Sequence, residues 1–305
     1  MRFRAKTLED VQDELWIYSP STDPKIKPLS LFHYTSNDSK SKIVDEETGS
    51  VNFRLTMTAD FLDKNEGIYI LEPYYHACGY LYDNNIIDFD FYSILKSIKP
   101  SDIADEAKDL WILCLTAEGY SKYMKERYAP NDGWQIELTA MSFEDLVFDF
   151  NSCDNSPNYV YLAEIQYSYK MMKKQIQKAI KRIYNFYKSD NSVLENEKRI
   201  IVVQSVIAYL TKYNFCYKSS SYKEEKEIRL ICHIEKPFIR WNSKDNPGTY
   251  LYFEDNRLYL HFEQDCYRQS MQQPNIYNSI EINKSITTSL EIRETVKKRS
   301  KEFSK

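Results

Sequence analysis

Two carboxylates and a guanidinium recur at every second position of one segment, Glu225-Lys226-Glu227-Ile228-Arg229-Leu230. On a β-strand, alternate side chains share a face, so Glu225, Glu227 and Arg229 would lie together while the apolar residues between them face the core. We therefore expect the charged trio to face a cleft or solvent. Such a trio suits acid–base chemistry or the stabilisation of a cationic transition state. A solvated row of paired charges accounts for the pattern equally well.

A second set of chemical groups stands at His33, Tyr34 and Thr35, at the end of a short apolar run. An imidazole, an aromatic ring and a hydroxyl in succession can hold ribose hydroxyls and a flat heterocycle. An edge strand whose histidine is satisfied by a neighbour gives the same three residues. That structural origin is the commoner one for so short a motif.

A third candidate is Thr116, which ends a continuous apolar run at residues 111–116, with Tyr128 on the helix predicted to follow it. A hydroxyl at a buried strand end and a tyrosine ring nearby can form a stacking pocket. The chain holds 26 tyrosines, however, and tyrosine rings commonly pack on a sheet without binding a ligand.

Residues 169–188 have the period of an amphipathic helix that contains no acidic residue. A basic stripe lies on a different face from the apolar one and consists of Lys173, Lys174, Lys178, Lys181 and Arg182. We expect this stripe to be exposed and, if it is functional, to contact a nucleic acid or an acidic partner. A lysine face that is merely solvated is the commoner outcome of such a pattern.

Composition excludes several classes of protein. The chain has 305 residues and a formal net charge of −4, so no global basic field attracts nucleic acid or lipid. Its 6 glycines stand apart, which excludes a G-x-G-x-x-G turn and a P-loop. The cysteines and histidines show no ligand spacing, so we expect reduced thiols and no metal site. With no secretory signal and no apolar run of membrane-spanning length, we expect a cytoplasmic protein without membrane contact.

The elements that must position these groups are strands near both ends of the chain and helices in the middle, an α+β arrangement. We predict a split mixed β-sheet with flanking helices. Residues 1–30 would form an N-terminal helix and linker, and residues 31–305 a single α+β domain with a helical insertion at 168–218. Strands are expected at residues 31–35, 51–58, 111–116, 134–138, 159–167, 227–234, 249–253, 257–262 and 277–282, and further helices at 89–98, 120–128 and 289–305.

The predicted insertion contains two long helical periods, at residues 169–188 and 192–213, joined by a polar Ser-Asp-Asn turn. We expect the two helices to pack on the sheet as an antiparallel hairpin. The side chains of the second helix that should then be buried are Ile200, Val203, Ile207 and Leu210.

Six short motifs in this order resemble a bacterial family catalogued as domain of unknown function 2971, related to the AbiGi abortive-infection proteins. The motifs are His33-Tyr34-Thr35, Leu62-Asp63-Lys64-Asn65-Glu66, Cys114-Leu115-Thr116-Ala117-Glu118, Met124-Lys125-Glu126-Arg127-Tyr128, Gly133-Trp134-Gln135-Ile136-Glu137-Leu138 and Glu225-Lys226-Glu227-Ile228-Arg229-Leu230. Two positions depart from the family: Asp63-Lys64-Asn65 replaces Asn-Asp-Pro, and Lys125 replaces a frequent tryptophan. The family implies phage defence, but it supplies no activity.

The order of a His-led strand, a strand ending in a hydroxyl and a late Glu-bearing strand also resembles the ADP-ribosyltransferases, at the level of the fold. That resemblance implies transfer of ADP-ribose from NAD, as substrate, to a protein or nucleic acid acceptor by a toxin-like effector. Glu227 and His33 would be catalytic, with His33 on the adenosine ribose. The remaining contacts with NAD would come from Tyr34, Thr35, Thr116, Tyr128, Glu225 and Arg229.

Two other functions fit the same residues. A non-catalytic, antitoxin-like protein would use the cleft to bind a ligand or partner, and it is favoured if Glu227 lies apart from His33 or is locked in an ion pair with Arg229. A metal-dependent nuclease using Asp63, Glu66 and Glu227 has less support, because no acid pair stands at ligand spacing.

Overall fold

A computed structural model describes residues 30–45, 47–61, 68–130, 133–152, 158–190, 194–235, 240–243 and 248–263. The predicted N-terminal helix, the turn at 62–66, the strand at 277–282 and the helix at 289–305 lie outside these residues. Of the described residues, those in 58–110 and 163–223 form one compact unit, the helical unit. Those in 30–57, 111–162 and 224–263 form the other, the sheet unit.

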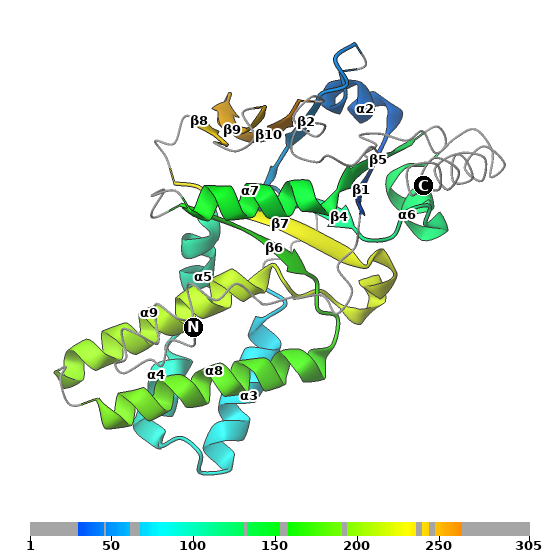
Figure 1. Ribbon diagram of the computed structural model, residues 1–305. Coiled ribbons are helices and arrows are strands. Elements are labelled where there is room, and N and C mark those ends of the chain that lie inside the picture. Colours follow the sequence, from blue (N-terminus) through cyan, green and yellow to red (C-terminus); the bar gives the residue numbers. More distant parts are fainter. Residues whose placement is uncertain are drawn as a thin grey trace, which may run out of the picture. The chain divides into compact units, whose positions relative to one another are not determined.

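The first sheet of the sheet unit contains the strands that carry the candidate groups (Figure 1). Its order is β5 (Trp134–Thr139), β1 (Ser30–Thr35), β4 (Leu110–Thr116), β7 (Glu227–His233) and β6 (Tyr159–Glu164), with β3 (Thr56–Met57) also paired to β4. β1 is antiparallel to β5 along its whole length, whereas its described register with β4 is the pair Phe32 and Thr116. β1 and β4 are therefore joined mainly near the end of β4.

The second sheet has four strands, which Figure 1 labels in the order β2 (Val51–Arg54), β10 (Arg257–Phe262), β9 (Thr249–Glu254) and β8 (Arg240–Asn242). All three pairings are antiparallel. Asp255 and Asn256 connect β9 to β10 with φ angles of 48° and 59°. Two successive left-handed residues are typical of a type I′ hairpin, and Asp and Asn tolerate this conformation better than most residues.

Both sheets contribute to one hydrophobic core, which also contains the helix α7 (Ala140–Ser152). The ring of Phe143 lies 5.4 Å from that of Phe262, and the ring of Phe150 lies 5.0 Å from that of Trp241. The helices α2 (Asn37–Ile43) and α6 (Lys122–Tyr128) also belong to the sheet unit. Sheets and helices in separate segments confirm the predicted α+β class.

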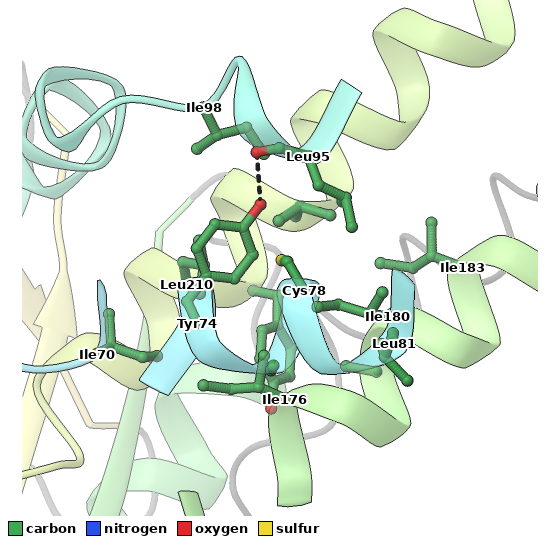
Figure 2. Packing of buried hydrophobic residues seen from close by; sticks show 14 of the residues in the cluster. Ile70, Tyr74, Cys78, Leu81, Leu95, Ile98, Ile176, Ile180, Ile183 and Leu210 are labelled. Carbon is green, nitrogen blue, oxygen red and sulfur yellow. Dashed lines mark hydrogen bonds between the residues drawn. The ribbon is translucent and has the colours of Figure 1, made fainter. Parts of the chain in front are cut away.

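The helical unit has its own hydrophobic core, shown in Figure 2. Its α-helices are α3 (Leu71–Asp83), α4 (Phe89–Lys96), α5 (Pro100–Glu106), α8 (Tyr169–Ser189) and α9 (Glu195–Asn214), with short 3-10 helices η1 (Thr58–Asp60), η2 (Ala107–Asp109) and η3 (Ser220–Glu225). Tyr74 is fully buried, and its hydroxyl donates to the carbonyl of Leu95, 2.8 Å away, so the ring fills the core without an unpaired polar atom (Figure 2).

The two predicted helices at 169–188 and 192–213 are present as α8 and α9, but one side chain was assigned to the wrong face. Leu210 is buried, Val203 and Ile207 are half-buried, and Ile200 is 57% exposed. The buried stripe passes through Val202, Val206 and Tyr209 instead. Within this unit α8 packs on α3 and on α9, and α9 also packs on α4 and α5. The predicted insertion at 168–218 therefore shares a compact unit with residues 58–110.

Asp88 ties α4 to α8. As the N-cap of α4, its Oδ1 accepts the N–H of Phe91 at 3.0 Å. Its Oδ2 accepts the hydroxyl of Tyr184 at 3.1 Å and the ammonium of Lys188 at 3.0 Å. Partial burial acts to raise the pKa of Asp88, but the three hydrogen bonds outweigh it and lower the pKa overall.

Replacing Asp88 with alanine should lower the free energy of unfolding by about 1 kcal/mol, because an N-cap is removed together with the contacts to α8. Since the folded-state pKa is depressed, the contribution of Asp88 is present at neutral pH and lost as the pH falls below about 4. Urea denaturation followed by circular dichroism, at neutral pH and at a pH below about 4, measures this contribution to the free energy of unfolding. Asp90→Ala, at an exposed position in the first turn of the same helix, is the matched control; equal losses in the two variants would contradict this role.

Candidate functional site

Thr116 joins the end of β4 to the segment that leads into β7. Its hydroxyl donates to the carbonyl of Glu225 at 2.7 Å and accepts the backbone N–H of Glu118 at 3.0 Å. Thr116 is fully buried. Because this hydroxyl both donates and accepts within the protein, it serves to hold the two strands together.

Tyr34 holds the loop between β4 and α6. Its hydroxyl donates to the carbonyl of Glu118 at 3.1 Å and accepts the N–H of Ser121 at 2.8 Å. Burial raises the pKa of Tyr34 to about 12, so the hydroxyl keeps its proton. In the same loop Gly119 lies against the ring of Phe32, where an added Cβ would come within 2.6 Å of the ring. A larger residue at position 119 would displace the ring of Phe32, and Tyr34 fixes the path of the loop.

Glu225 is a buried carboxylate that reaches toward the surface through α6. Its Oε1 accepts the hydroxyl of Tyr128 at 2.5 Å and lies 3.8 Å from Nε of Arg127. Tyr128 is 38% exposed, whereas Glu225 is 2% exposed. The next residue, Lys226, has a φ of 43°, and its ammonium pairs with the carboxylate of Glu118. The turn before β7 is thus held by a buried carboxylate that pairs with a partly exposed arginine and by a second, exposed ion pair.

Glu227 and Arg229 form a two-pronged ion pair at the start of β7. Nε of Arg229 lies 2.7 Å from Oε1 of Glu227, and Nη2 lies 3.1 Å from Oε2. Glu227 is 4% exposed and Arg229 is 0% exposed. The expectation that Glu225, Glu227 and Arg229 face a cleft or solvent is therefore wrong.

The error has a definite physical origin. Leu230 and Cys232 do lie in the core between the sheets, as strand alternation predicts. The opposite face of β7 is covered as well, so that all its residues except the half-buried Ile228 are buried. Strand alternation separates the two faces but does not say whether the second one is covered.

His33 lies on the other face of the sheet. Its ring meets that of Phe53 edge-on at 5.3 Å, and Phe53 belongs to the core between the two sheets, together with Leu31 and Leu115. Nδ1 of His33 donates to the carbonyl of Cys114 at 3.0 Å, which joins β1 to β4 beyond their described pair. Burial lowers the pKa of His33, so the imidazole is neutral and Nδ1 carries the proton.

The structure thus separates the predicted catalytic pair. Along a strand, side chains two residues apart lie on the same face of the sheet, and neighbouring side chains lie on opposite faces. Leu31 and Leu230 both belong to the core between the sheets and therefore mark the same face. His33 and Thr35 share the face of Leu31, and Thr35 is buried there. Glu227 and Arg229 lie on the face opposite to Leu230. His33 and Glu227 are therefore not brought into one pocket by this sheet.

Further residues, which were not predicted as members of the site, also hold these strands and loops together. The carboxylate of Glu118 pairs with Lys226, Arg127 lies near Glu225, and Oε1 of the buried Gln135 accepts the N–H of Tyr120 at 2.6 Å. Glu118 and Arg127 belong to the motifs quoted above, but their partners are distant in sequence. No spacing rule links residue 118 to residue 226.

No family model, curated protein or solved structure matches this chain. Among the residues described, no set of three His, Cys, Asp or Glu side chains is placed to hold a metal ion, and Asp63 and Glu66 of the nuclease hypothesis fall outside them. No helix in the described ranges is long and apolar enough to cross a membrane.

Glu227→Gln should destabilise the protein by about 3–5 kcal/mol, because a neutral amide replaces the carboxylate that pairs with the buried guanidinium of Arg229. Replacing both residues with apolar ones, Glu227→Leu with Arg229→Met, should recover much of this loss. Urea denaturation measures each free energy of unfolding.

Glu224→Gln, at an exposed position three residues earlier, is the control and should stay within about 0.5 kcal/mol of the wild type. A Glu227→Gln variant as stable as this control would show that the carboxylate is not needed for folding and is free for chemistry.

Proposed function

We propose that this chain is a non-catalytic binding protein for a polyanionic partner, with nucleic acid as the leading candidate, rather than an ADP-ribosyltransferase. The observation that carries the proposal is the buried ion pair between Glu227 and Arg229. A transferase would need this carboxylate to hold a ribose hydroxyl and to face the positive charge that develops as the bond to nicotinamide breaks. Here both carboxylate oxygens accept N–H groups of Arg229, whose charge neutralises that of Glu227.

The hydroxyls expected to hold NAD support the same proposal. Those of Thr116 and Tyr34 are each engaged as both donor and acceptor with the backbone. The imidazole of His33 is engaged with Cys114 on the other face of the sheet. A bound nucleotide would have to break these contacts, whose loss leaves buried polar groups unpaired at about 1–3 kcal/mol each.

The charged surface for a partner is α8. Lys174, Lys178 and Lys181, three of the predicted stripe, are exposed, and Lys170 extends the row at the same spacing. These four lysines, the α8 lysine row, lie on one face and span about 16 Å at 1.5 Å per residue. No acidic side chain in the described part of the chain pairs with any of the four.

The other two predicted members are less available. Lys173 is half-buried, with Nζ 5.4 Å from the ring centroid of Tyr80, and Arg182 is half-buried. Four unpaired cations in a row, with no acid in the helix between them, match the spaced charges of a phosphate backbone. The contact would be insensitive to base sequence, because lysines on phosphates carry no base readout.

The triple variant Lys174→Glu, Lys178→Glu, Lys181→Glu should weaken binding of a labelled oligonucleotide more than about tenfold. It should also reduce the slope of log affinity against log salt by up to about 3, at about 0.9 per lost phosphate contact. Fluorescence anisotropy at several salt concentrations measures both quantities.

The matched control reverses three other exposed lysines of the helical unit: Lys96, Lys108 and Lys223. If oligonucleotide binding is weakened equally in both triple variants, the cause is the change in net charge. That result would contradict a binding site on α8. If polyglutamate competes for the α8 surface and unlabelled nucleic acid does not, the partner is an acidic protein rather than a nucleic acid.

A further inference from the structure

The outer face of the second sheet carries four aromatic rings in two rows. One row joins Asn52, His261, Tyr250 and Asn242 across the four strands, and the next joins Arg54, Tyr259, Tyr252 and Arg240. The residues between them on β2, β9 and β10 point into the core, including Phe53, Leu251 and Leu260. The four rings are half-buried, so each keeps part of its surface open to solvent.

A continuous stack begins at Arg240 in the second row and runs through Tyr250 and His261 of the first row. The guanidinium of Arg240 lies 4.1 Å from the ring centroid of Tyr250. The ring of Tyr250 lies 4.4 Å from that of His261 and is inclined to it by 19°. Burial lowers the pKa of His261, so the imidazole is neutral and stacks as a flat, uncharged heterocycle.

The stack ends in a hollow of about 680 Å³. Its walls come from the end of α2, from Asp45, Glu47 and Ser50, and from the sheet, and they include Lys42, Ser41, Asn52 and His261. Tyr250 stacks on one side of the imidazole, and Asn52 is the cross-strand neighbour of His261 on the other; both Asn52 and His261 line the hollow. The volume is in the range of small-molecule sites, and one wall is a ring on which another ring can stack.

Asn52 adds a polar group to this wall. Its Nδ2 donates to the hydroxyl of Tyr252 at 2.9 Å, whereas its buried Oδ1 has no partner among the described residues. A small rotation of this half-buried side chain would let a ligand N–H pair with the oxygen. Such a bond would recover the cost of an unpaired buried acceptor.

The charges divide between the hollow and the open face. In the hollow, Lys40 and Lys42 are balanced by Asp45 and Glu47, and the carboxylate of Asp45 is engaged with Thr48. Among the described residues, the open face carries Arg54, Arg240 and Arg257 together with Glu254, and the carboxylate of Glu263 acts on the rings of Tyr250 and His261. Inside the hollow the charges balance, so a ligand there would be held mainly by stacking. Beside the hollow, the arginines would attract anionic groups of the ligand.

We propose that this hollow accepts one unpaired nucleobase, which continues the stack of Arg240, Tyr250 and His261, while the arginines beside it contact phosphate. The proposal deepens the proposed function, on which it rests for the class of ligand, and assigns single-stranded nucleic acid as the form that is bound. Bases in a duplex are already stacked and cannot enter the hollow, whereas base–aromatic stacking tolerates any unpaired base. The site uses no residue of the α8 lysine row.

The test compares a labelled single-stranded 12-mer with the duplex of the same sequence, using the whole protein. His261→Ala should weaken binding of the single strand about 5- to 150-fold, the equivalent of one lost base–aromatic stack of about 1–3 kcal/mol. Binding of the duplex and the salt dependence should not change. His261→Tyr keeps a flat ring and should restore binding, and Ser41→Trp, at an exposed position on the rim, should block the hollow without removing the stack.

Full competition by a mononucleotide would identify a free nucleotide as the ligand with the same chemistry, and competition by a neutral oligosaccharide would overturn the proposal. Unchanged single-strand binding in both His261→Ala and Ser41→Trp would also overturn it, even if charge reversal on α8 abolished binding. If instead these two variants weaken single-strand binding and charge reversal on α8 does not, the result supports the base site. It would contradict the proposal that α8 binds nucleic acid.

Discussion

The ion pair between Glu227 and Arg229 is the constraint on which the candidate site depends. Neither charge can be buried alone, because the loss of hydration costs several kcal/mol per ion, so each side chain is held where it neutralises the other. The pair fixes the start of β7, and the preceding turn brings Glu225 and Lys226 to the end of β4. Thr116, Tyr34 and Tyr128 then attach β1, β4 and α6 to the same point. The groups that looked catalytic in the sequence are the ones that join these strands.

The groups that we propose for recognition lie elsewhere, on two exposed surfaces of the described residues. In the helical unit, the α8 lysine row is exposed because the apolar stripe of α8 packs on α3. In the sheet unit, the outer face of the second sheet carries rings and arginines because its inner face fills the shared core. Each surface is a consequence of amphipathic packing, and the two differ in chemistry: one offers cations alone, the other offers cations beside a stack of rings.

Much of the fold could be predicted from the sequence, because the strongest patterns are local. The apolar run of β4 and the lysine and isoleucine stripes of α8 identify their elements directly. The predicted elements do not include α7, although Phe143, Leu146 and Phe150 have helical spacing. The helical period places Ile200 on the buried face, but in the structure α9 packs on α4 and α5 and buries Val202 and Val206 instead. For the site, alternation identified the core face of β7 but could not reveal that the opposite face is covered.

The buried ion pair makes Glu227 a structural group, and on this ground we propose that the chain does not transfer ADP-ribose from NAD. The most direct measurement is the release of nicotinamide from NAD by the purified wild-type protein, with a bacterial lysate as the source of acceptors. We expect no release above that of a heat-denatured sample. Release by the wild type that is lost in Glu227→Gln, compared at equal concentrations of folded protein, would contradict this proposal and restore the transferase.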